Sequence, residues 1–190
     1  MASFARDIRT VPNLMTLSRI AFIYAAVALY LNGAHLWALI VGTVAGLTDL
    51  FDGIVARRTG QVTRLGEVLD QFSDLVFETQ AFALYLVCGG EYAFVLLGAY
   101  LFREFWVVSI RRFTAEYRIN IRSNFLGKLK TNFIGYGSLL VFASLSGQIT
   151  ALDPWMRWLG NVGFFGGVGL GYIAAFDYSR QFIRGYNEVA

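Results

Sequence analysis

Six apolar stretches of roughly membrane-spanning length follow one another in a chain of 190 residues. A helix needs about 20 residues to cross the hydrocarbon core, where the backbone must satisfy its own hydrogen bonds. Only 15% of the residues are charged, against about 25% in soluble domains. The sequence therefore predicts an all-α, polytopic membrane bundle that forms a single domain over residues 1–190. The predicted spans lie near residues 14–31, 34–56, 66–87, 92–113, 129–147 and 157–179.

Positive charge is distributed unevenly between the two ends of these predicted helices. Three short turns, at Asn32-Gly33, Gly89-Gly90 and Asp153-Pro154, contain almost no Lys or Arg, whereas the opposite ends are rich in both. The positive-inside rule places the basic side and both termini in the cytoplasm. We therefore expect a multi-pass protein of the inner (cytoplasmic) membrane, with residues 1–11 forming a short juxtamembrane segment on its inner surface.

The composition also excludes several kinds of site. The single cysteine, Cys88, cannot form an intrachain disulfide, and the single histidine, His35, cannot build a histidine metal cluster. The first twelve residues lack the pattern of a cleavable signal peptide, so we expect the first apolar segment to stay in the mature protein. The expected environment is the lipid bilayer, and no nucleic-acid partner is expected.

Two pairs of aspartates lie near the cytoplasmic ends of the second and third predicted helices. Asp49 and Asp52 are three residues apart, and Asp70 and Asp74 are four apart, so each pair shares one helical face. The connection between the helices is rich in arginine, which places both pairs near the same membrane surface. Converging carboxylates repel one another unless a cation neutralises them, and oxygen ligands suit Mg²⁺, Mn²⁺ or Ca²⁺. The alternative is that these aspartates pair with nearby arginines for structure alone.

The segment from Asp49 to Asp74 fits one spaced pattern without insertion, D-x2-D-G-x2-A-R-x8-G-x3-D-x3-D. Each residue type makes up only about 5–8% of average proteins, so a chance match is on the order of 10⁻¹⁰ per start position. The fixed positions are Asp49, Asp52, Gly53, Ala56, Arg57, Gly66, Asp70 and Asp74. This pattern resembles that of the CDP-alcohol phosphatidyltransferase family, and the six-span layout extends the resemblance to nearly the whole chain.

The resemblance implies an enzyme that transfers a phosphatidyl group from a CDP-linked lipid to a small alcohol. It implies that Asp49, Asp52, Asp70 and Asp74 bind divalent metal. The expected metal is Mg²⁺ or Mn²⁺, and the expected number of ions is two. Asp74 would also act as general base on the acceptor hydroxyl. The residues implied to line the CDP site are Asn13, Thr16, Gly53, Ala56, Arg57 and Gly66. A homodimer is implied as well, and the glycine-rich segment 160–171 is suited to close helix packing.

Two further stretches are similar to the phosphatidylglycerophosphate synthase branch of that family. Residues 12–19 read PNLMTLSR, and residues 103–131 form a basic segment that ends in GKLKT. A basic loop beside the metal site suits an anionic acceptor, and the resemblance implies CDP-diacylglycerol as donor and glycerol 3-phosphate as acceptor. The residues expected to bind the acceptor phosphate are Arg64, Arg112, Arg118, Ser123 and Lys128.

The resemblance to this branch departs at two positions. Gln71 and Leu75 stand where the synthases usually have proline and lysine after the third and fourth aspartates. Another acceptor, such as phosphatidylglycerol, inositol phosphate or serine, or a CDP-alcohol donor, therefore stays open. Alternatives from other classes are a divalent-cation transporter that uses the acidic residues as an ion path and a non-catalytic scaffold. Glu78, Arg103 and Glu104 receive no role.

Overall fold

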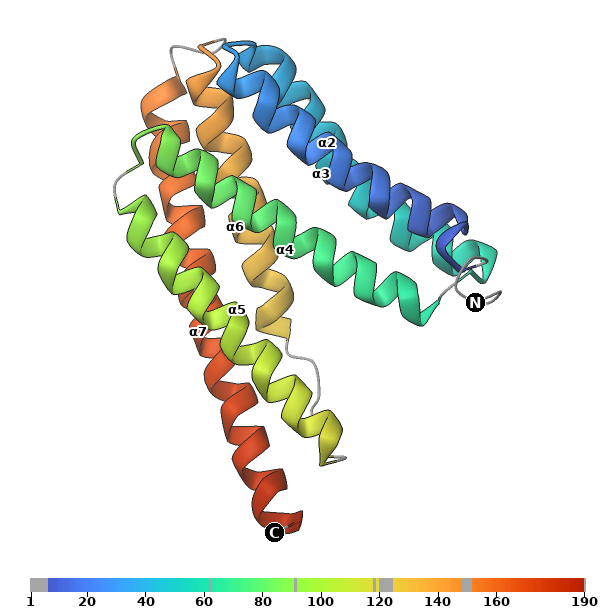
Figure 1. Cartoon of the computed structure of the whole chain (residues 1–190). Coiled ribbons are helices and arrows are strands. Elements are labelled where there is room, and N and C mark those ends of the chain that lie inside the picture. The colour runs from blue at the N-terminus through green and yellow to red at the C-terminus, as the bar shows by residue number, and fades with distance from the viewer. Residues whose placement is uncertain are drawn as a thin grey trace.

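The protein is built from long helices, and the part of the chain that the structure describes contains no strand (Figure 1). The computed structural model describes residues 7–61, 63–90, 92–117, 119, 125–147 and 152–189; the side chains at 49–54, 56, 57 and 189 lie outside this description. The helices are α2 (Val11–Leu31), α3 (His35–Thr59), α4 (Arg64–Val87), α5 (Ala93–Glu116), α6 (Phe125–Leu145) and α7 (Asp153–Val189). The predicted all-α fold is confirmed, and each predicted span corresponds to one helix.

The helix ends differ from the predicted spans in two places. Helix α7 continues to Val189, well beyond residue 179. The more polar residues after 179 contain no proline, so the helical backbone continues after the apolar stretch has ended. The predicted juxtamembrane segment 1–11 falls mostly outside the described residues, and α2 already begins at Val11.

Three helices of the described chain are long and apolar enough to cross a membrane, judged by length and composition. They are α2, α5 and α7, and the N-terminal part of α3, His35–Thr48, is a shorter apolar helix. The chain is therefore an integral membrane protein, and three of its six predicted crossings have this support.

Glycines end two of the helices at the predicted turns. Gly33 follows α2 with a φ of 80°, and Gly89 follows α4 with a φ of 72°. A residue with a Cβ rarely adopts this left-handed conformation, so glycine allows the chain to reverse within a few residues. Helix α7 instead begins at Asp153 with Pro154 in its first turn, where the missing N–H of proline costs no helical hydrogen bond.

Helix α4 joins two groups of helices. Helix α2 packs along α3, while α7 packs against both α5 and α6, and α4 contacts α2, α5 and α6. Figure 1 shows α4, in teal to green, running between the α2–α3 pair and the other three helices. Helix α3 also contacts α6, so the groups meet at two places, and Asp70 and Asp74 lie on α4, which contacts helices of both groups.

Helices α6 and α7 approach until their backbones touch. A Cβ added to Gly163 would lie 2.6 Å from Cα of Gly137, and one added to Gly137 would lie 2.9 Å from the carbonyl oxygen of Gly160. No larger residue fits at these positions without moving one helix. The glycine-rich segment therefore serves packing within one chain.

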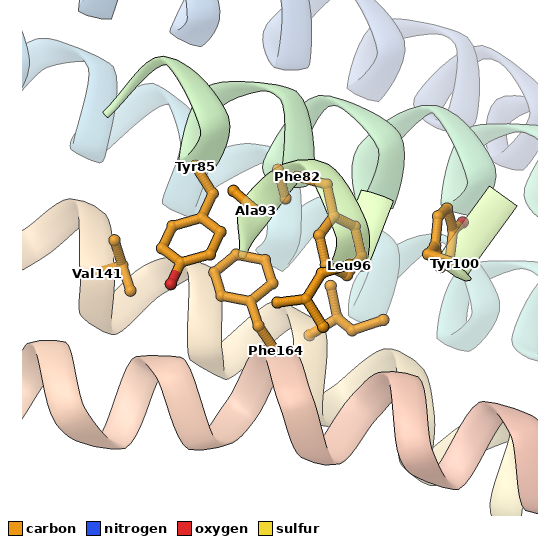
Figure 2. Packing of buried hydrophobic residues seen from close by; sticks show 9 residues of the cluster. Phe82, Tyr85, Ala93, Leu96, Tyr100, Val141 and Phe164 are labelled. Atoms are coloured by element: carbon orange, nitrogen blue, oxygen red, sulfur yellow. The ribbon is translucent and has the colours of Figure 1, made fainter. Parts of the chain in front are cut away.

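A cluster of aromatic side chains holds the second half of α4. Phe164 of α7 stacks on Tyr85 with ring centroids 4.5 Å apart, and Phe82 stacks on Tyr100 of α5 at 5.0 Å. Figure 2 shows these rings meeting among α4, α5 and α7, and all four are nearly fully buried. Aromatic pairs of this kind add to the apolar burial, so this half of α4 is firmly packed.

Candidate active site

One face of α2 carries polar side chains that are buried inside the bundle. Asn13, Thr16 and Arg19 follow one another at intervals of three residues and are only 2%, 4% and 2% exposed. This spacing places them on one side of the helix, and contacts of Asn13 and Arg19 put this side against the beginning of α4. Polar groups are rarely buried without a partner, so this face marks a specific contact between the two helices.

Arg19 pairs with both described aspartates of the sequence pattern. Its Nη2 lies 2.8 Å from Oδ1 of Asp74, and its Nη1 lies 3.9 Å from Oδ1 of Asp70. The Arg19 side chain is 3% exposed, whereas those of Asp74 and Asp70 are 34% and 55% exposed. The buried guanidinium thus holds two carboxylates that remain accessible from outside the bundle. The structure brings Asp70 and Asp74 to one place, and their role as metal ligands stays a prediction.

Arg19 is the last residue of the segment 12–19 that is similar to the synthase branch, and the sequence alone predicted no role for it. Its partner Asp74 lies 55 residues further along the chain. The available indication was an arginine in the third turn of an apolar helix, since a charge in a membrane segment usually has a partner. Spacing alone does not identify that partner.

Asn13 and Gly66 fit together where α2 meets the first turn of α4. The Asn13 amide donates hydrogen bonds to the hydroxyl of Thr63, at 3.2 Å, and to the carbonyl of Asp7, at 2.8 Å. The Thr63 hydroxyl in turn accepts from the Gly66 N–H at 2.9 Å and caps α4. A Cβ at Gly66 would lie 2.6 Å from Oδ1 of Asn13, so only glycine fits here.

The roles predicted for these residues toward CDP stay predictions. The Asn13 amide bonds protein groups, and the Thr16 hydroxyl donates to the carbonyl of Pro12, at 3.1 Å, one turn earlier in its own helix. Both side chains lie beneath the protein surface. In this arrangement they order the junction of α2 and α4 beside Arg19.

Several predicted site residues fall outside the described part of the structure. The side chains of Asp49, Asp52, Gly53, Ala56 and Arg57 are among those not described, although their segment is continuous helix within α3. Arg118 and Ser123 also lie outside the described residues. Their predicted roles are therefore neither supported nor opposed by the geometry.

The other predicted acceptor residues lie at helix ends. Arg64 opens α4, Lys128 belongs to the first turn of α6, and Arg112 lies in the last turns of α5; all three are exposed. Because successive helices run in opposite directions, these ends lie at the same end of the bundle (Figure 1). The helix ends that carry these basic residues thus lie toward the end of the bundle where α4, the helix of Asp70 and Asp74, begins.

An apolar cavity of about 260 Å³ begins beside Arg19. It is lined by α2, α3, α4 and α6, and small residues such as Ala45 and Gly46 form part of its wall. Tyr30 and His35 also line it, and their rings meet edge to face at 4.5 Å. Because Arg19 lines it, this cavity places an apolar space beside the arginine that pairs with Asp74.

The donor atoms of Asp70 and Asp74 fit a hard divalent metal. Both side chains offer carboxylate oxygens, which Mg²⁺ and Mn²⁺ prefer, and both are partly exposed. Among the described side chains, no group of three or more His, Cys, Asp or Glu residues could hold an ion. The other two predicted ligands, Asp49 and Asp52, belong to the side chains not described, so the four-aspartate metal site stays a prediction.

Comparison with known proteins identifies the family. The family model for CDP-alcohol phosphatidyltransferase matches residues 9–165. A Salmonella choleraesuis protein named CDP-diacylglycerol–glycerol-3-phosphate 3-phosphatidyltransferase is 31% identical over 174 residues, covering 87% of this chain and 86% of its own. Proteins with the same name from Escherichia coli and Rickettsia bellii are each 30% identical, covering 87% and 75% of this chain and 86% and 80% of their own. The chain belongs to the CDP-alcohol phosphatidyltransferase family.

Proposed function

We propose that this enzyme transfers a phosphatidyl group from CDP-diacylglycerol to glycerol 3-phosphate and releases CMP, as a step of phospholipid biosynthesis. The observation that carries the proposal is the pairing of Asp70 and Asp74 with buried Arg19, which lines an apolar cavity. The choice of donor and acceptor is supported by the names of the similar bacterial proteins and by the basic helix ends around the aspartates.

Asp74 is placed to take a proton from the acceptor. Its carboxylate is partly exposed, and Arg19 fixes one of its oxygens. The hydroxyl proton of glycerol 3-phosphate passes to Asp74 while the hydroxyl oxygen bonds to the phosphatidyl phosphorus. The bond from that phosphorus to the bridging oxygen breaks, and CMP leaves with the electron pair. Positioning and charge stabilisation are sufficient for such a transfer, so no covalent enzyme intermediate is needed.

The family generally depends on a divalent metal. Asp70 and Asp74, together with Asp49 and Asp52, would hold Mg²⁺ or Mn²⁺, with two ions as our proposal. When bound, the metal supplies positive charge to the pyrophosphate of the donor. Arg19, which lies 2.8 Å from Asp74 and 3.9 Å from Asp70, would hold the two described carboxylates near one another for this purpose.

The apolar cavity has the length and chemistry to take one acyl chain of the donor. Arg19 and Tyr30 both line it, and the eleven residue steps from one to the other along α2 rise about 16 Å. Half of a hydrocarbon core is about 15 Å thick. An acyl chain in this cavity would place its phosphate end near Arg19 and Asp74.

The acceptor phosphate would be bound by Arg64, Arg112 and Lys128, with Arg118 and Ser123 as further candidates. We propose that their end of the bundle faces the cytoplasm, that all six helices cross the inner membrane, and that both termini are cytoplasmic. The homodimer stays a prediction.

A donor and acceptor panel tests the proposed function. Purified protein with CDP-diacylglycerol and Mg²⁺ should release CMP only when glycerol 3-phosphate is present, and the lipid product should be phosphatidylglycerophosphate by mass spectrometry. Phosphatidylglycerol, inositol phosphate and serine serve as alternative acceptors. CMP release that does not depend on glycerol 3-phosphate would overturn the acceptor assignment.

A further inference from the structure

A second group of charged side chains is buried in the bundle, apart from Arg19 and its aspartates. Lys130 of α6 lies between two carboxylates, with its Nζ 2.7 Å from Oε2 of Glu78 on α4 and 2.7 Å from Oε1 of Glu104 on α5. Arg103 also pairs with Glu104, and its Nε donates to the carbonyl of Gly171 on α7 at 3.0 Å. These contacts join four helices, and we refer to Glu78, Arg103, Glu104 and Lys130 as the buried charge network.

Stability alone is a weak reason for such a network. Its formal charges cancel, two acidic against two basic, but each charge loses its hydration when it is buried, as Glu78 is at 1% and Lys130 at 6% exposure. Apolar side chains of similar size often replace a buried ion pair with no loss of stability, and charges within membrane segments usually serve function. The position of the network relative to the active site indicates what that function is.

The network lies one helical turn from Asp74. Glu78 follows Asp74 by four residues on α4, so the two side chains share a face and are separated by about 6 Å along the helix axis. Lys130 follows Lys128, a predicted acceptor residue, by two residues on α6. One ion pair thus connects the helix of the proposed general base to the helix end proposed to bind the acceptor.

Helix α4 is therefore held by ion pairs from two other helices. Arg19 of α2 binds it at Asp74, and Lys130 of α6 binds it at Glu78. Apolar contacts allow a helix to slide or rotate by small amounts, whereas a short ion pair accepts little change in distance or direction. Since a 1 Å misplacement of a catalytic group can cost about 10²-fold in rate, this difference matters most near Asp74.

We propose that Lys130 is a positioning residue for the transfer reaction, an inference that rests on the proposed function. Through Glu78 it fixes the depth and rotation of α4, and thereby the place of Asp74 relative to the acceptor bound at the end of α6. Lys130 does not itself contact the acceptor, because it is enclosed between Glu78 and Glu104 with its Nζ 5.2 Å from the Tyr100 ring centroid.

The test compares single and double apolar variants in full-length protein. Lys130→Met leaves two acidic groups against one cation, and Glu78→Met leaves the cations in excess, so each single variant should lower both the melting temperature and kcat. The double variant Glu78→Met/Lys130→Met restores charge balance and should recover the melting temperature. Its kcat should nevertheless stay at least roughly tenfold below that of the unmodified protein, because the restraint on Asp74 is absent.

A purely structural network predicts a different result for the double variant, namely recovery of kcat together with the melting temperature. That outcome would overturn the inference and leave the proposed function intact. Glu78→Gln/Lys130→Met, which also leaves one acidic and one basic group, provides the same comparison if the double methionine variant fails to fold, and Arg184→Met on the exposed tail of α7 is the control. Absence of glycerol 3-phosphate-dependent CMP release from the unmodified protein would overturn the proposed function, and the inference with it.

Discussion

The guanidinium of Arg19 lies 2.8 Å from the carboxylate of Asp74, and this ion pair joins α2 to α4. The arginine is buried and the aspartate is partly exposed. Asp74 is consequently fixed from the interior of the bundle while it remains accessible to a substrate.

Removal of the Arg19 side chain's charge should impair the reaction more than the fold. We expect Arg19→Gln to lower kcat/KM by about 10²-fold, since Asp70 and Asp74 lose their common partner and shift position. Arg19→Lys should retain part of the activity, because one ammonium replaces the contact at 2.8 Å without the fork that reaches Asp70. CMP release and thermal unfolding are the measurements, with Arg180→Gln on the exposed part of α7 as control. Unchanged kcat/KM in Arg19→Gln would contradict this role.

Asp74→Asn should abolish transfer while the helical fold persists. The amide keeps the size of the side chain but cannot accept the hydroxyl proton, and general-base catalysis is worth about 10²–10⁴-fold in rate. The control is Asp177→Asn on α7, where the carboxylate accepts a hydrogen bond from Gln181, 2.9 Å away. Circular dichroism checks the fold. An Asp74→Asn protein with more than a tenth of normal activity would rule out the general-base assignment.

Gly66→Ala should loosen the junction of α2 and α4. The new Cβ would lie 2.6 Å from Asn13 Oδ1, and overpacking of this kind costs about 1–3 kcal/mol. Gly98→Ala on α5 is the matched control, because a Cβ there meets nothing within 4 Å. Adding Asn13→Ala to Gly66→Ala removes the obstructing atom and should recover part of the lost unfolding free energy. If it recovers none, the clash with Asn13 is not the cause.

A larger side chain in the apolar cavity should weaken binding of long-chain donors. Gly46 lines the cavity, and a Cβ at this position meets nothing within 4 Å. Gly46→Leu should raise KM for long-chain CDP-diacylglycerol about tenfold. The leucine side chain would displace about two methylenes of the acyl chain, and the burial of each methylene contributes about 0.8 kcal/mol to binding. A short-chain donor should be affected less. Gly98→Leu is the control, and an equal rise in KM for both donors would argue against an acyl chain in this cavity.

Metal removal should stop the reaction, and Asp70→Asn should weaken its metal dependence. EDTA is expected to abolish CMP release, with recovery on addition of Mg²⁺ or Mn²⁺. In Asp70→Asn, half-maximal activity should require a higher metal concentration, because one anionic ligand is lost. Direct Mn²⁺ binding, followed by electron paramagnetic resonance, separates a loss of affinity from a loss of rate. Unaltered Mn²⁺ affinity would exclude Asp70 as a ligand.

Sequence reasoning located the helices well because membrane-spanning length and turn residues are local properties. The turns at Gly33 and Gly89 appear where they were expected, whereas the polar end of α7 carried no hydropathy pattern to extend its predicted span. The spacing of Asp70 and Asp74 also predicted that they share a face of α4. The family assignment followed from the same spacing and is confirmed by the comparisons.

The sequence did not indicate which charged groups meet across helices. Lys130 finds Glu78 at a separation of 52 residues, and that pairing depends on the rotation of α4 and α6 about their axes. Hydropathy reports helix length, and in helices that are apolar on most sides it says little about rotation. Glu78, Arg103 and Glu104 therefore remained without a role until their contacts were known.

The small size of Gly171 has a consequence for how ions are accommodated inside this bundle. A methyl group at this position would lie 3.2 Å from Cδ of Lys130 and 3.4 Å from Nε of Arg103, so the bare backbone leaves room for both cationic side chains. Its uncovered carbonyl then accepts the Arg103 hydrogen bond that water would provide at a protein surface. Inside this bundle, a backbone carbonyl beside a glycine thus provides the hydrogen-bond acceptor that the buried Arg103 side chain would otherwise take from solvent.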